Sequence, residues 1–120
     1  MPLQTLTLTI PAGQSLSNGV NCSKGKVTLI EFPAAWNDAN VSFQVSSDGN
    51  AWHDYYYLNP GERMPMGLRE VIVPAIANIA TIVLTDWASN LLWLKIRSGS
   101  ADQPRIQSAD RTFVLTVDTD

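Results

Sequence analysis

Apolar and polar residues alternate with a period of two along most of this chain, the pattern of β-strands that bury one face. Residues 4–10 are the clearest case, because leucine and isoleucine fall on one side of the extended chain and three threonines on the other. Residues 41–46 and 92–97 repeat the alternation, and no stretch with helical period exceeds a turn or two. The sequence therefore predicts an all-β fold.

Prolines, glycines and short polar clusters divide the chain into about eight short strands. Asp48-Gly49 predicts a hairpin turn, because glycine adopts the positive backbone angle that a tight turn requires. We expect no helix beyond a single turn, at 38–40 or 86–88. The expected strands are residues 4–10, 26–32, 41–46, 52–58, 68–73, 79–84, 92–97 and 111–117. Such strands in 120 residues predict one domain, residues 1–120, folded as an antiparallel β-sandwich or jelly roll.

Charge is sparse and slightly acidic, which argues against two classes of partner. Lys and Arg number 8 and Asp and Glu 11, for a net charge of −3, and the arginines are scattered among acids. A phosphate backbone requires a clustered basic face, so we expect no direct nucleic-acid partner. The longest uncharged apolar run, residues 72–84, is broken by Pro74 and Asn78 and is too short to cross a bilayer. We also expect no secretory signal, because the first residues lack a basic start before an apolar core.

The side chains that most enzymes and metal sites use are scarce. The chain has one histidine, His53, and one cysteine, Cys22, so an internal disulfide is excluded and the usual zinc ligands are lacking. A Cys22–His53–Asp54 triad is disfavoured, because neighbours on a strand point to opposite faces. Residues 48–50 resemble a calcium loop only faintly. Turn or cap chemistry explains Asp38, Asp48, Asp54 and Asp86 better than a pair of catalytic carboxylates does. We therefore expect no enzyme, metal or cofactor.

Four tryptophans in so small a domain allow two interpretations, packing in the core or exposed rings that contact a partner. Trp52 follows the hairpin turn at the start of a strand, and we expect it in the core. Other aromatic residues fall in loops or on strand faces that lie opposite an apolar side, and they are candidates for a protein interface or for stacking against sugar rings. These candidates are Trp36, Tyr55, Tyr57, Trp87 and Trp93.

Two further features leave alternatives open. The threonine face of residues 4–10 could pair with the edge of a neighbouring chain, although a solvated sheet face is the favoured interpretation. The loop at 98–110 is longer than a compact sandwich needs, and loops of that length are often functional. It either reaches a neighbouring subunit or wraps its own domain.

A local resemblance concerns the hairpin at 43–52 (FQVSSDGNAW) together with the late strand at 92–97 (LWLKIR). These segments resemble the hairpin and late strand of discoidin-type, galactose-binding-like jelly rolls. The resemblance covers about a fifth of the chain and concerns the fold, because the Ser-Asp-Gly-x-x-Trp pattern is structural in those domains.

A second resemblance covers most of the chain. It is carried by residues 9–17 (TIPAGQSLS), 32–36 (FPAAW), the Ser-Asp-Gly hairpin, 96–100 (IRSGS) and 107–111 (QSADR). Together they resemble small proteins encoded among the structural genes of tailed bacteriophages. The resemblance implies a virion component on the head surface, made in the host cytoplasm, either a capsid decoration (cement) protein or part of a head fibre or spike. Its implied partners are the major capsid protein or another virion protein, and its own copies in a symmetric oligomer such as a trimer.

The sequence thus favours a non-enzymatic phage structural protein that acts by protein–protein contact. The alternative is a carbohydrate-binding jelly-roll module that recognises a host-surface glycan through its tryptophans or tyrosines. A remote hydrolase that depends on His53 is a third and weaker hypothesis.

Overall fold

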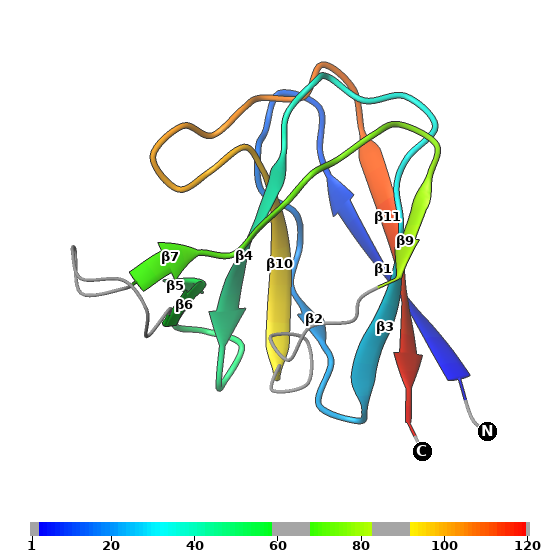
Figure 1. Cartoon of the computed structure of the whole chain (residues 1–120), viewed down its shortest axis with the longest axis vertical. Helices are drawn as coiled ribbons and strands as arrows, with labels where there is room; N and C mark the ends of the chain where they lie inside the picture. The colour runs from blue at the N-terminus through cyan, green and yellow to red at the C-terminus, as the bar shows by residue number, and fades with distance from the viewer. Residues whose placement is uncertain (1–2, 59–67, 83–91, 120) are drawn as a thin grey trace.

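The computed structural model describes residues 3–58, 68–82 and 92–119, and in these ranges the regular structure is entirely β (Figure 1). The predicted all-β class is confirmed, and neither residues 38–40 nor any other described segment forms a helix. No helix there is long and apolar enough to cross a bilayer. The strands are β1 (Leu3–Ile10), β2 (Val20–Asn21), β3 (Lys26–Glu31), β4 (Val41–Ser46), β5 (His53–Asp54), β6 (Tyr56–Leu58), β7 (Leu68–Glu70), β8 (Ile72–Val73), β9 (Ala80–Ile82), β10 (Trp93–Ser98) and β11 (Arg111–Asp118).

Two antiparallel sheets form a sandwich. One sheet has the order β1-β11-β3-β9 and the other β2-β10-β4-β5, with β8 also paired to β4. The chain crosses repeatedly between the sheets, since β1, β3, β9 and β11 lie in one and β2, β4, β8 and β10 in the other (Figure 1). β1 and β11 pair along their whole length, which places the two ends of the chain side by side.

The core lies between the two sheets and is built by the alternation that the sequence displays. Leu8 and Ile10 from β1 and Phe113 and Leu115 from β11 meet Phe43 across the sandwich, and all five are fully buried. The threonines of β1 face outward as expected. A bulge opposite Thr116 and Val117 changes the phase of β3, so that Val27 and Ile30, three residues apart, both face the core.

The sequence predicts eight strands and the described ranges contain eleven, because two expected strands are broken and one was missed. The expected strand at 52–58 divides into β5 and β6, the strand at 68–73 divides into β7 and β8, and the two-residue β2 has no pattern in the sequence. Each division marks the place where the chain leaves one strand partner for another. The strand at 79–84 is found as β9, and residues 83–84 lie outside the described ranges.

The Asp48-Gly49 turn is confirmed and joins β4 to β5 through a six-residue loop. Gly49 has a φ of 80°. The Asp48 carboxylate accepts hydrogen bonds from the backbone N–H groups of Asn50 and Ala51, at 2.8 and 3.0 Å. These bonds, together with one from Ser46 Oγ, lower the pKa of Asp48. The carboxylate thus holds the turn, as turn chemistry predicts.

The loop at 98–110 folds back on its own domain through Gln107, which is completely buried. Gln107 Nε2 donates to the Asn37 carbonyl at 3.0 Å and to Ser98 Oγ at 2.7 Å. Its Oε1 accepts from the Asn37 N–H at 2.9 Å and from Arg111 Nε at 3.1 Å. The Gln107 backbone also bonds to residues 13–14. Gln107 therefore connects three loops at the same end of the sandwich, two through its side chain and the third through its backbone.

Replacing Gln107 with leucine should lower the free energy of unfolding by about 2–4 kcal/mol, because buried donors and acceptors around it lose their partners. Chemical denaturation followed by tryptophan fluorescence measures the change. Gln103→Leu in the same loop is the control, since Gln103 is exposed and its side chain should be dispensable. Equal stability of the two variants would refute the fastening role of Gln107.

Candidate protein-contact site

A two-stranded ribbon, formed by β6 and β7, extends from the edge of the second sheet (Figure 1). It leaves the sheet at Tyr55, whose N–H donates to the Phe43 carbonyl at 3.1 Å. It returns at Val71, whose N–H donates to the Tyr55 carbonyl at 2.9 Å, and β8 then pairs with β4. β5 and β8 both pair with the edge of β4, and the ribbon leaves the sheet between them.

The ribbon carries large apolar side chains into solvent. Tyr56, Tyr57 and Leu68 are 44%, 48% and 50% exposed. A two-stranded ribbon is at best marginally stable by itself in water, and this one buries little of its own apolar surface. Its geometry must therefore be held from its base or by a partner.

A buried arginine holds the base. Arg97 on β10 points to the outer face of the second sheet, yet only 6% of the residue is exposed. Its Nε donates to Ser42 Oγ at 2.9 Å, Nη1 to Asp54 Oδ1 at 2.8 Å and Nη2 to Glu70 Oε2 at 2.7 Å. These partners come from β4, β5 and β7, so one guanidinium joins the sheet to both sides of the ribbon base. A guanidinium can do this because its donors are fixed in a planar fork.

The same network reaches the loop that follows β10. Ser42 Oγ donates to the Gly99 carbonyl at 2.7 Å, and Glu70 Oε2 accepts from the Ala101 N–H at 2.9 Å. In the described part of the chain, every buried side-chain nitrogen or oxygen has a hydrogen-bond partner. The buried charge is therefore fully compensated, which a polar group removed from water requires.

Trp52 lies on this outer face and not in the core, so its predicted position is wrong. It is half-buried, and Lys95 Nζ lies 4.5 Å from the centroid of its ring. A Cβ on Gly19 would lie 2.7 Å from the Trp52 ring, which is closer than packing allows. The indole therefore fits here because residue 19 is a glycine. Trp52 turns outward because it shares the strand face of Asp54, two residues further on, which meets Arg97.

The four aromatic candidates that the structure describes do not form one cluster. Trp36 is half-buried and packs edge-on against Phe113 at 5.3 Å, with its Nε1 bonded to the Ala39 carbonyl. Tyr55 is half-buried against the core, and this burial raises the pKa of its phenol. Trp93 is half-buried on the outer face of the second sheet, where its ring lies against Gly49. Tyr57 is the most exposed of the four that the structure describes, and Trp87 lies outside the described ranges.

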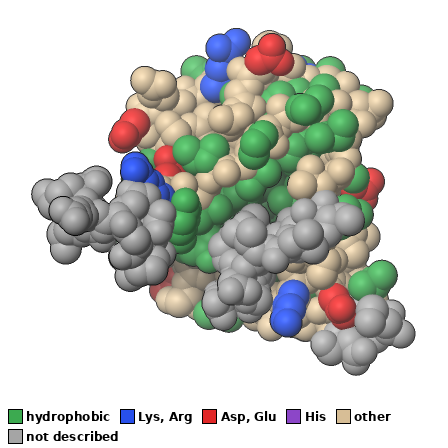
Figure 2. Space-filling view, in the orientation of Figure 1, with side chains coloured by type: hydrophobic (Ala, Val, Ile, Leu, Met, Phe, Trp, Pro, Cys, Tyr) green, Lys and Arg blue, Asp and Glu red, His purple; other side chains and the backbone are tan. Residues whose placement is uncertain are grey.

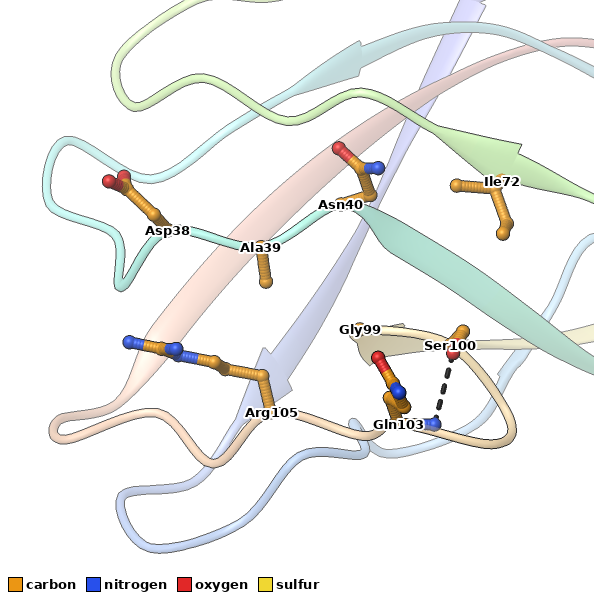
Figure 3. Close-up of a pocket in the computed structure, with 8 residues that line it drawn as sticks. All are labelled: Asp38, Ala39, Asn40, Ile72, Gly99, Ser100, Gln103 and Arg105. Carbon is orange, nitrogen blue, oxygen red and sulfur yellow. Dashed lines mark hydrogen bonds between the residues drawn. The ribbon is translucent and has the colours of Figure 1, made fainter.

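A shallow groove of about 370 Å³ opens where the loops at 33–40 and 98–105 approach β8 (Figure 3). Figure 3 shows Asp38 and Arg105 at one end of it and Asn40 and Gln103 toward the other. Its apolar lining consists of Ala39, Ile72 and Gly99. Such a mixture of charged, amide and aliphatic groups suits a small polar ligand, although no aromatic ring lines the groove.

Apolar side chains also gather on the face seen in Figure 2. Three isoleucines in the segment that leads from β8 to β9 are exposed, Ile72 by 44%, Ile76 by 62% and Ile79 by 38%. Like the ribbon side chains, these are large apolar groups that the described part of the domain leaves exposed.

The thiol and the imidazole lack the features of a catalytic pair. Cys22 is buried, and burial raises its pKa to about 11, so its nucleophilic thiolate form is disfavoured at neutral pH. His53 is exposed and pairs with Val45, whereas Asp54 pairs with Gln44, so the two side chains point to opposite faces as expected. Within 3–58, 68–82 and 92–119, no three metal-ligating side chains cluster.

Sequence reasoning missed the site around Arg97. Asp54 was assigned to turn or cap chemistry, and this prediction is wrong because its carboxylate bonds to Arg97. The alternation does indicate that Arg97 lies on the outer strand face, together with Trp93 and Lys95. Its partners, however, are 27 to 55 residues away along the chain, and no local pattern connects them.

The Asp54–Arg97 pair predicts a specific dependence of stability on pH. The hydrogen bond from Arg97 is the main cause that lowers the pKa of Asp54 in the folded protein. Its stabilising contribution is therefore present above the unfolded pKa, about 4, and is lost as pH falls through the lower folded value. Urea denaturation between pH 7 and pH 3 should show a smaller acid-induced loss in Asp54→Asn than in the wild type, with Asp102→Asn as the exposed control. An identical pH profile for Asp54→Asn and the wild type would contradict the pairing.

Comparisons of this chain with protein-family models, curated proteins and solved structures found no match. The resemblance to phage structural proteins therefore stays a prediction.

Proposed function

We propose that this chain is a non-enzymatic structural protein of a tailed-bacteriophage virion, a capsid decoration protein or a component of a head fibre or spike. The observation that carries the proposal is the anchored ribbon, which holds Tyr56, Tyr57 and Leu68 in solvent. Tyrosine is among the side chains that dominate the energy of protein interfaces. The proposed partner is the major capsid protein or another virion protein.

The rest of the surface supports a function in contact with protein. Charged residues make up 16% of the chain, against about 25% in an average soluble domain. Exposed isoleucines continue the apolar surface between β8 and β9. Protein-contact surfaces are depleted in charge at their centres, and the low charge content of this chain fits such a surface.

The proposal includes assembly with other copies. Homo-oligomers commonly have closed symmetry, and the phage resemblance implies a symmetric oligomer, such as a trimer, on the head surface. The net charge of −3 supports attachment to protein over direct attachment to the packaged genome. Synthesis in the host cytoplasm and assembly onto the head would follow.

Purified particles test this function directly. Mass spectrometry of gradient-purified virions should detect the chain at a constant ratio to the major capsid protein. Tyr57→Ser should reduce incorporation at least about tenfold, because one interface anchor contributes 1.4 kcal/mol or more. Ile106→Ser, which removes a 65% exposed side chain outside the ribbon, is the matched control. Abundant protein in the lysate with none in the particles would overturn the proposal.

A carbohydrate-binding module is the second candidate, and the groove in Figure 3 is the observation that favours it. Asp38, Asn40, Gln103 and Arg105 offer donors and acceptors for hydroxyl groups, and Ile72 offers an apolar patch for a sugar face. The role of Trp36 as a stacking platform has less support, because its ring packs against Phe113.

An NMR titration with monosaccharides and host-surface glycans tests this second function. Binding should shift the amide signals of residues 38–40 and 99–105, and Arg105→Ala should weaken the affinity at least about tenfold, as expected for the loss of a charged hydrogen bond. Arg69→Ala on β7 is the charge-matched control, because Arg69 is exposed and does not line the groove. Unchanged spectra at millimolar glycan would exclude the groove as a glycan site.

A further inference from the structure

β1 has an open hydrogen-bonding edge. It is the outer strand of its sheet and pairs only with β11 among the described strands. At Thr9 the backbone N–H donates to Asn18 Oδ1 at 2.8 Å, and the Thr9 carbonyl accepts from the Asn18 N–H at 3.4 Å. The Thr9 backbone groups therefore point away from β11. Because this direction repeats every second residue, those of Leu3, Thr5 and Thr7 point away as well.

This edge lacks the features that protect strand edges from pairing with other chains. Natural edges are commonly short, charged, interrupted by proline or bulged. β1 has eight residues, carries no charge and no proline, and pairs with β11 without a break in register. The other described outer strands of the two large sheets are β9 with three residues and β2, β5 and β8 with two residues each. The long edge of β4 is covered by β5 and β8.

The edge is complementary to itself. Two copies of residues 3–7 can pair antiparallel around a two-fold axis at Thr5. Thr5 then meets Thr5 of the second copy, and Leu3 of each copy meets Thr7 of the other, which gives three pairs. Each of these three pairs has its N–H and carbonyl groups directed at the other chain, so each exchanges two hydrogen bonds. Threonine pairs across strands are favourable, and no like charges oppose each other. Leu3, which is 59% exposed, is covered by the methyl group of Thr7 from the second copy.

We propose that β1 pairs with β1 of a second copy of this chain, which joins the two four-stranded sheets into one eight-stranded sheet. The contact is isologous, since the same segment is used by both copies. One strand pair is a small interface, so we expect a reversible dimer with a dissociation constant in the micromolar range. The inference concerns only contact between copies and stands whether or not the chain belongs to a virion.

Variants that introduce a charge at Thr5, on the proposed two-fold axis, test the proposal. Sedimentation of the wild type should show dimers that increase with concentration. Thr5→Lys and Thr5→Glu should each raise the dissociation constant at least about tenfold, because like charges then face each other on the axis. An equal mixture of the two variants should restore the dimer. Thr5→Val, which keeps an uncharged β-branched residue, should associate like the wild type.

A proline variant provides a second route if a charged variant fails to fold. Thr5→Pro removes an N–H that points away from β11, so it should spare the pairing of β1 with β11 and abolish the dimer. Near-ultraviolet circular dichroism confirms the native fold of each variant. A wild type that stays monomeric at several hundred micromolar, or charged variants that associate like the wild type, would overturn the proposal. Neither result bears on incorporation into particles, so the virion function is tested separately.

Discussion

The buried guanidinium of Arg97 is the contact that joins the second sheet of this sandwich to its exposed ribbon. Its three hydrogen-bonding nitrogens bond to Ser42, Asp54 and Glu70, so the sheet, the ribbon base and, through Glu70, the loop after β10 are joined at one point. A cation in this position is costly unless every donor is used, and removing one partner would leave an uncompensated charge. The base of the ribbon is therefore rigid, while β6 and β7 keep exposed tyrosines beyond it. Gln107 has the corresponding role at the loop end of the sandwich.

The hydrogen-bond networks of Arg97 and Gln107 explain how a domain with few charges can expose apolar side chains and still keep its fold. Chains usually bury such groups or surround them with charge. Here the core between the sheets is complete without the ribbon, the exposed isoleucines or the edge of β1. We infer that these uncovered elements serve contact with other proteins, which is the basis of both the proposed virion function and the proposed pairing of two copies.

Local alternation predicted the parts of the fold whose partners are set by strand periodicity. Leu8, Phe113 and Ile96 are buried as their positions predict, and the threonines of β1 face outward. Prediction failed where a long-range contact changes the local pattern. Trp52 and Asp54 lie on the outer face because Arg97, more than 40 residues later, binds the Asp54 carboxylate. The bulge in β3 and the division at Tyr55 likewise depend on partner strands and leave no mark in the alternation. The aromatic candidates could be named from sequence, but their environments could not, since Trp36 owes its packing to Phe113.

The central claim is that an uncovered element of this domain, here the edge of β1, is a contact surface. Amide hydrogen exchange, measured residue by residue at low and at high protein concentration, tests this claim most directly. The amides of Gln4 and Leu6 face β11 and should be protected at every concentration. Those of Thr5 and Thr7 should exchange rapidly in dilute solution and become protected as the concentration rises, because a second copy then covers them. Rapid exchange of Thr5 and Thr7 at all concentrations would contradict the account for the β1 edge.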